Sequence, residues 1–120
     1  MAARQSTDSF LPLTHLGFHI LLSLSEAPAH GYALVQQVRE RSGGTIDPGT
    51  GSFYSVVRSL SDDKLIKEIG APSADADTRR RYYTVTPLGS AVLAAEARRL
   101  ETLLAATRRL QHAGHPGTKR

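Results

Sequence analysis

The spacing of apolar residues changes twice along this chain, and that order limits the folds it can adopt. Between residues 13 and 60, apolar positions recur every three or four residues, which is the repeat of an amphipathic α-helix. Residues 65–86 contain two short segments of β-strand type, and the helical spacing returns between residues 88 and 110. The sequence therefore predicts helices, then a β-hairpin, then a long final helix.

Proline and glycine divide the first part into three helices. The first lies between two prolines, and the second spans residues 30–41 and ends before Gly43, which can adopt the left-handed cap conformation. The third starts in the stretch DPGTGS, where Asp47 or Thr50 can accept the free N–H groups of the first turn. The apolar positions are Leu13, Leu16, Gly17, Ile20, Leu21 and Leu24 in the first helix, Tyr32, Leu34, Val35 and Val38 in the second, and Phe53, Val56, Val57 and Leu60 in the third.

The hairpin is predicted from the segments LIKEI and RRRYYTVT, which are joined by the loop GAPSADAD. Side chains alternate along a strand, so Tyr83 and Val85 share one face with Arg81, and that face suits the core. Arg79, Arg80 and Arg81 would then lie at the strand end nearest the loop tip, where a wing meets the DNA backbone. The alternative is a charged strand end that serves only solubility.

The final helix is predicted to use Thr86 as its N-cap, to open at Pro87 and to run to about Leu110. Its leucines continue past Leu100, further than a domain of this size can cover. A partner chain is the natural cover for this surface.

The expected fold class is mainly α with a two-stranded β wing. Residues 11–86 are predicted to form a winged helix-turn-helix domain, and residues 87–111 a C-terminal dimerisation helix. Residues 1–10 and 112–120 show no periodicity, and we expect them to be flexible.

Composition excludes several classes of function. With 120 residues and 13.0 kDa the chain holds one core, and its net charge of +4 with a pI of about 9.9 mildly favours polyanions such as nucleic acid. The absence of cysteine excludes disulfides, thiol nucleophiles and cysteine metal sites, and fits a cytoplasmic protein. The most apolar segment, residues 16–24, is interrupted by glycine and polar residues, so we expect neither a signal peptide nor a membrane span.

The outward side of the third helix is the first candidate DNA-binding surface. It is small and polar around one arginine, with Ser52, Tyr54 and Ser55 beside Arg58. Arg58 can bind a guanine edge or a phosphate, and the hydroxyl groups can bind bases or phosphates. The alternative is the ordinary polar side of an amphipathic helix.

His30, Gly31 and Tyr32 open the second helix, where outward N–H groups and the tyrosine hydroxyl can bind phosphate. The alternative places Tyr32 in the core. His15 and His19 are spaced to share a metal ion, but no cysteine or carboxylate at ligand spacing accompanies them. They can instead face an effector pocket or a partner subunit.

Enzymatic motifs are lacking in the sequence. The serines have no glycine-flanked elbow, and the stretch GGTIDPGTG has no lysine and serine or threonine at P-loop spacing. We therefore expect no catalytic residue, no metal and no cofactor.

Three motifs in order resemble the PadR family of bacterial transcription regulators, over about residues 16–104. LSEAPAHGYALVQQV is similar to the junction of the first two helices, GSFYSVVRSLSDDKLI to the recognition helix, and RRRYYTVTPLGSAVLAAE to the wing strand and the start of the dimer helix. The single final helix resembles the short subfamily. Lys64 stands where the family usually has glycine, so a positive φ there would cost about 1 kcal/mol.

The resemblance implies a homodimeric repressor that binds double-stranded DNA at a palindromic operator, with a small-molecule effector near the dimer interface in many members. The chain has no tryptophan, so the aromatic stacking of some drug-sensing relatives is not available in the same form. The alternatives are a metal-sensing regulator that uses histidines, and a winged-helix interaction module without DNA binding. The DNA-binding residues implied are His30, Gly31, Tyr32, Ser52, Tyr54, Ser55, Arg58, Arg79, Arg80 and Arg81. The dimerisation residues implied are Leu16, Ile20, Val92, Leu93, Leu100, Leu103 and Leu104.

Overall fold

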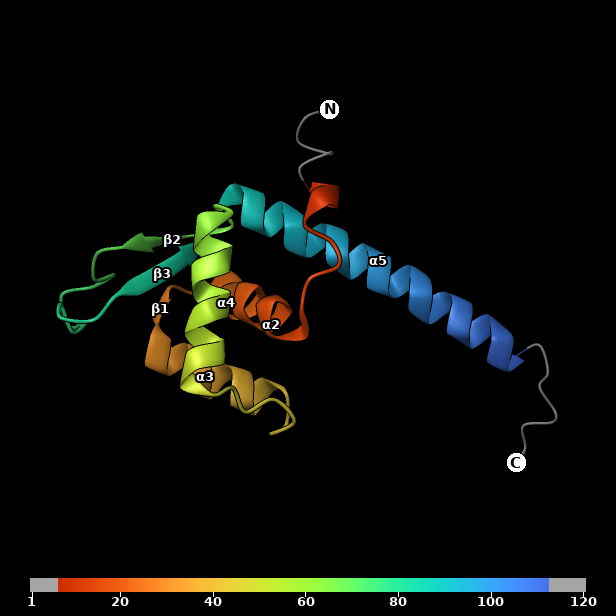
Figure 1. The fold of residues 1–120 in the computed structure, drawn as a ribbon, viewed down its shortest axis with the longest axis horizontal. Helices are drawn as coiled ribbons and strands as arrows, with labels where there is room; N and C mark the ends of the chain where they lie inside the picture. The colour runs from red at the N-terminus through yellow and green to blue at the C-terminus, as the bar shows by residue number, and fades with distance from the viewer. Residues whose placement is uncertain (1–6, 113–120) are drawn as a thin grey trace.

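The computed structural model describes residues 7–112, and Figure 1 shows the path of the chain. Three helices pack together beside a small sheet whose hairpin projects to one side, and a long helix extends to the other side. The expectations for residues 1–6 and 113–120 lie outside the described residues. In chain order the elements are α2 (His15–Glu26), β1 (Ala29–His30), α3 (Gly31–Arg41), α4 (Thr50–Asp62), β2 (Ile66–Ile69), β3 (Tyr82–Val85) and α5 (Pro87–His112).

Local hydrogen bonds explain where the helices begin and end. Thr14 caps α2 by accepting the Gly17 N–H at 2.9 Å, and Thr86 caps α5 by accepting the Gly89 N–H at 3.0 Å. Helix α3 ends at Ser42, and the following Gly43 has φ 65°, as the sequence predicts. The predicted α4 cap is wrong, because the N-cap is Gly49, which makes no side-chain cap hydrogen bond.

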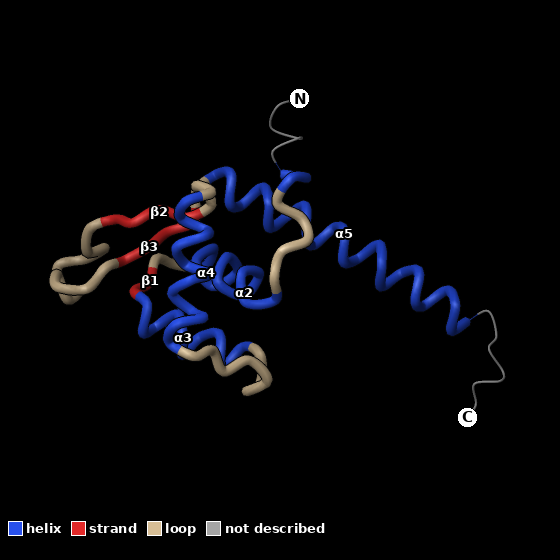
Figure 2. The backbone as a smooth tube through the Cα atoms, in the orientation of Figure 1, coloured by secondary structure: helices blue, strands red, loops and turns tan. Residues whose placement is uncertain are grey.

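The sheet is antiparallel with strand order β1-β3-β2, so it has three strands rather than the two predicted. The additional strand β1 pairs Ala29 with Tyr83 and His30 with Tyr82. Two residues are too short to show the alternation from which a strand is predicted. Strand β3 is also shorter than predicted, and the residues before it, 70–81, form the wing loop that joins β2 to β3 (Figure 2).

One core joins all the helices to the sheet. Its buried members include Ile20, Leu21, Leu34, Val38, Phe53, Leu65, Ile66 and Val92. Phe10, Leu11 and Leu13 pack against this core, and residues 7–9 are helical. Of the flexible terminus expected over residues 1–10, residues 7–10 are therefore ordered differently, because Phe10 packs against the core.

The turn between α4 and β2 is joined to the start of α5. Lys64 has φ 66°, so the positive φ inferred from the resemblance is present on a residue other than glycine. The Leu65 carbonyl accepts hydrogen bonds from the backbone N–H and the hydroxyl of Thr86, at 3.0 and 3.1 Å. Gly89 lies against the same carbonyl, where a Cβ atom would overlap it. The close approach explains why position 89 is glycine.

Helix α5 leaves the body of the domain about halfway along its length. Glu96 is only 2% exposed; its carboxylate accepts hydrogen bonds from Arg99 at 2.6 and 3.0 Å and from the Leu13 N–H at 2.9 Å. After this point large apolar side chains are exposed on α5: Leu100, Leu103, Leu104 and Leu110. These four leucines form the α5 leucine stripe.

Two of the residues assigned to the dimer surface are placed differently by the structure. Ile20 and Val92 are fully buried in the chain's own core, because α5 packs along α2 of the same chain. They are not available for direct contact with a partner. Leu16 and Leu93 are half-buried beside that core, whereas Leu100 remains exposed with its neighbours in the α5 leucine stripe.

Candidate nucleic-acid interface

Helix α4 buries one side and exposes the other, as its sequence predicts. Phe53, Val57 and Leu60 lie in the core. The opposite side exposes Ser52, Tyr54, Ser55 and Arg58. Within residues 7–112 Arg58 makes no hydrogen bond or ion pair, so its guanidinium is available to a ligand. This surface has the donors that direct contact with base edges or phosphates requires.

Tyr54 joins the exposed side of α4 to the start of α3. Its ring packs edge to face on Phe53, with centroids 5.0 Å apart, and its hydroxyl lies over Gly31. A Cβ atom at Gly31 would stand 2.5 Å from that hydroxyl oxygen. Gly31 therefore allows the tyrosine to approach the first turn of α3.

His30 caps α3 in the neutral state. Its Nδ1 atom accepts the Ala33 N–H at 3.2 Å, and its ring packs edge to face on Tyr82 with centroids 5.4 Å apart. Burial lowers the pKa of His30, and the positive charge of Arg80 lowers it further. The imidazole acts as a hydrogen-bond acceptor at this cap, so its neutral form is the one that fits.

Tyr32 lies at the surface and not in the core, so the alternative of a buried tyrosine is wrong. Its side chain is 61% exposed, and its ring stacks near His30 at a centroid distance of 6.5 Å. The Arg80 guanidinium lies over the Tyr32 ring, 6.0 Å from the ring centroid. Tyr32 therefore connects the first turn of α3 with the wing loop.

The three wing arginines have different surroundings and lie in the wing loop, before β3. Arg79 and Arg80 both pair with Asp77, at 3.1 and 3.5 Å, and hydrogen bonds from Arg79 hold the pKa of Asp77 below its usual range. Arg81 makes no hydrogen bond or ion pair within the described part of the chain. The prediction that all three share the strand end is wrong, because β3 begins only at Tyr82.

Two neighbouring clefts bring these segments together. One, of about 200 Å³, lies between the start of α3 and the wing loop, and is lined by His30, Gly31, Tyr32, Tyr54, Arg80, Arg81 and Tyr83. The other, of about 190 Å³, lies between α4 and the hairpin, and its lining includes Arg58, Glu68 and Arg81. Tyr54, Arg81 and Tyr83 line both clefts. Ser52, Ser55 and Arg79 are exposed but line neither.

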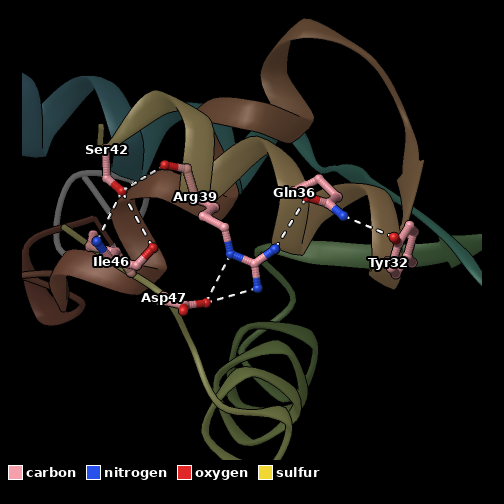
Figure 3. Close-up of polar contacts among 6 residues, drawn as sticks. All are labelled: Tyr32, Gln36, Arg39, Ser42, Ile46 and Asp47. Atoms are coloured by element: carbon pink, nitrogen blue, oxygen red, sulfur yellow. Dashed lines mark hydrogen bonds and ion pairs between the residues drawn. The ribbon is translucent and has the colours of Figure 1, made fainter. Parts of the chain in front are cut away.

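A row of polar contacts along α3 was not predicted (Figure 3). Tyr32 Oη accepts a hydrogen bond from Gln36 at 2.9 Å, and Gln36 Oε1 accepts one from Arg39 at 3.2 Å. Arg39 in turn pairs with Asp47 at 2.8 Å, and Ser42 Oγ accepts the Ile46 N–H at 3.0 Å. These contacts hold the connection to α4, whose first turn lacks a side-chain cap. The three- and four-residue spacing on α3 was the available signal for the first two contacts.

The histidine pair on α2 is close but isolated. The His15 and His19 ring centroids are 5.0 Å apart, and burial followed by the nearby His15 and Arg41 charges lowers the pKa of His19. Among residues 7–112 no three His, Cys, Asp or Glu side chains are grouped to hold a metal ion. The described helices also include none with the length and apolar character needed to cross a membrane.

Comparison with known proteins gives the context of this surface. The sequence model of the family described as "Transcriptional regulator PadR-like family" matches residues 20–95, more than half of the chain. A PadR-like transcriptional regulator from Bacillus cereus has a TM-score of 0.70 at 22% identity, covering 83% of this chain and 93% of its own. A PadR family transcription regulator from Clostridium difficile has a TM-score of 0.69 at 21% identity, covering 82% and 99%.

A protein of 37.1 kDa in a transposon of Streptomyces fradiae is 29% identical over 84 residues. The match covers 70% of this chain but only 22% of that protein, so the chain spans less than a quarter of its relative. The two structural likenesses agree on the fold, a winged helix with a long C-terminal helix. The family consists of transcriptional regulators and not of enzymes. With the family match over residues 20–95, the chain belongs to the PadR-like family of transcriptional regulators.

Proposed function

We propose that this protein is a homodimeric repressor that binds a palindromic operator in double-stranded DNA. The observation that carries the proposal is the convergence of the α3 start, α4 and the wing loop on two adjoining clefts lined by arginines. Three separate chain segments contribute donors there. Such a surface can hold a duplex in register, because phosphate contacts position the protein while α4 meets the bases.

Each segment has a distinct role in this proposal. Helix α4 enters the major groove with Ser52, Ser55 and Arg58 toward the bases. His30, Gly31 and Tyr32 lie at the first turn of α3, where backbone N–H groups and the tyrosine hydroxyl meet a phosphate. The wing arginines meet the neighbouring backbone. Tyr54 supports both helices and adds a hydroxyl to the surface.

The α5 leucine stripe is the proposed dimer contact. Its members are 40–70% exposed in the single chain and follow the three- and four-residue spacing of one helical side. A second copy that packs on the stripe, and on the half-buried Leu16 and Leu93, would remove this apolar surface from water. Two-fold symmetry then requires half-sites about 34 to 36 Å apart, or a multiple of that distance.

Repression and its relief complete the proposal. A dimer bound across a promoter excludes other proteins from it, and a small-molecule effector near the dimer contact would change the spacing of the two α4 helices. Such a regulator acts in the cytoplasm, where the DNA is.

Binding to DNA upstream of the gene tests the proposal directly. We expect footprinting to reveal two protected half-sites related by a two-fold axis, and fluorescence anisotropy to show binding that survives an excess of unrelated duplex. If the protein gives only the weak, salt-sensitive background that any basic protein shows, the interaction module becomes the better interpretation. If zinc changes operator affinity and a His15→Ala, His19→Ala variant does not respond, the metal-sensing alternative is favoured.

A further inference from the structure

Asp77 forms ion pairs with two of the three wing arginines, Arg79 and Arg80. Its Oδ1 atom accepts hydrogen bonds from the Arg79 backbone N–H at 2.9 Å and from Arg79 Nε at 3.1 Å. Its Oδ2 atom lies 3.3 Å from an Arg79 terminal nitrogen and 3.5 Å from Arg80 Nε. Both carboxylate oxygens are therefore engaged, in the fork arrangement that an arginine also makes with a phosphate.

Arg80 has further contacts within the protein. One of its terminal nitrogens lies 3.3 Å from His30 Nδ1, and its guanidinium lies over the Tyr32 ring. The Arg80 side chain is 46% exposed, compared with 88% for Arg79. Arg81 differs from both, since it is exposed and makes no ion pair with any residue that the structure describes.

We propose that Asp77 is a built-in competitor for DNA phosphate, so that Arg81 is the wing arginine available in the free protein while Arg79 and Arg80 are restrained. This inference rests on the proposed function and deepens it. The carboxylate would lower nonspecific DNA binding, because a phosphate must displace Asp77 before it reaches Arg79 or Arg80. A well-placed operator phosphate can make this exchange more readily than the backbone of an arbitrary duplex.

The strengths of the contacts are suited to such an exchange. Exposed ion pairs of this kind contribute little to stability, since water and salt screen them. An uncompensated carboxylate beside the DNA backbone also repels it. Removal of the charge therefore affects binding twice, by freeing two arginines and by removing a repulsive group.

The test compares Asp77→Asn with Asp75→Asn in the full-length protein. Asparagine keeps an oxygen that can accept the Arg79 backbone N–H, so the turn is retained while the charge is lost. Asp75 lies in the same loop, is exposed and makes no ion pair within the described residues, so Asp75→Asn changes the net charge equally. Affinity for an unrelated duplex, with no operator sequence, is measured by anisotropy across a salt series.

We expect D77N to bind the unrelated duplex about three- to tenfold more tightly than D75N at low salt, with a salt dependence steeper by about one to two units. Adding Arg79→Ala and Arg80→Ala to D77N should remove this gain. In the wild type, Arg81→Ala should weaken binding more than Arg79→Ala does.

Equal binding by D77N and D75N would overturn the inference, and so would weaker binding by D77N, because Asp77 would then preorganise the arginines for phosphate. These outcomes leave the proposed function standing if the wild-type protein still binds its operator specifically. Failure of the wild type to bind any operator would instead overturn the proposed function.

Discussion

Arg58 is the arginine on the exposed side of α4, and its proposed role is contact with a base. It projects from the exposed side of α4 and has no partner among residues 7–112. A guanidinium in this position can bind the two acceptors of one guanine edge. The effect of Arg58 on base preference can therefore be measured separately from the effect of its positive charge on affinity.

Arg58→Ala should weaken operator binding by about 1 to 3 kcal/mol and relax the preference at one base position, because a base-reading contact is lost. Anisotropy with operators mutated one position at a time measures both effects. Arg98→Ala removes an equal charge from the exposed side of α5 and serves as the control. Loss of affinity that is uniform over all sequences would show that Arg58 binds phosphate instead.

His30 should make the folding stability depend on pH. Its pKa lies below the usual 6.5, so the unfolded chain binds a proton more readily than the folded one. The free energy of unfolding should therefore fall as the pH drops through 6.5, until the folded-state pKa is passed. The charged groups near the ring, Arg80 and Asp77, have opposite effects, and burial has the largest effect.

Chemical denaturation at a series of pH values checks this dependence. His30→Asn retains a capping side chain that does not titrate, so part of the pH dependence should disappear in this variant. His19, whose pKa is also lowered, remains in both proteins, so the difference between them isolates His30. Identical pH profiles for the two proteins would show that His30 does not contribute.

At the scale of elements, the contact between the α4–β2 turn and α5 leaves no room for a side chain at position 89. Gly89→Ala should destabilise the protein by about 1 to 3 kcal/mol, because its Cβ would meet the Leu65 carbonyl, a backbone group that cannot rotate away. Denaturant melts measure the effect. Gly51→Ala makes the same change in α4 in open space, where helix propensity predicts a gain of up to about 1 kcal/mol.

Helix spacing could be predicted from the sequence because it is a local property. The helices were found within about two residues of their observed ends, as was the positive φ at Gly43. Contacts between segments that are distant in the sequence could not be predicted, because no local repeat encodes them. The hydrogen bond from the Leu13 N–H to Glu96 joins residues 83 positions apart, and β1 becomes a strand only because β3 lies beside it.

The elements that carry the residues proposed for DNA contact could be predicted from the sequence, but the contacts among those residues could not. Every residue proposed for DNA contact lies in α3, α4, the wing loop or the adjoining cap. The exposure of Tyr32 depends on which side of α3 meets the core, and the pairing of Arg79 and Arg80 with Asp77 depends on the loop conformation. Neither is encoded in a local repeat.

At the scale of the whole molecule, the α5 leucine stripe is the proposed dimer contact. Leu103→Glu should raise the dimer dissociation constant by on the order of 100-fold, because it would place a charge in an apolar contact. Operator affinity should fall with it, since two half-sites are no longer bound together. Light scattering measures the mass, and anisotropy measures the binding.

Thr102→Glu is the matched control, because Thr102 is exposed on the opposite side of the same helix. It should leave both the mass and the operator affinity close to those of the wild type. A monomeric wild-type protein, or a dimer that Leu103→Glu does not disturb, would show that the stripe is not the contact.

Helix α5 is anchored to the body at two places, the Leu65 carbonyl beside Gly89 and the hydrogen bond from the Leu13 N–H to Glu96, so only the part beyond Glu96 projects as an arm. This arm, residues 97–112, is about 24 Å long, so a tilt of about 5° where it leaves the body moves the far end by about 2 Å. If two such helices are clamped together, the same tilt displaces each DNA-reading surface instead. A small change in tilt where the arm leaves the body would therefore change the distance between the two α4 helices of such a dimer.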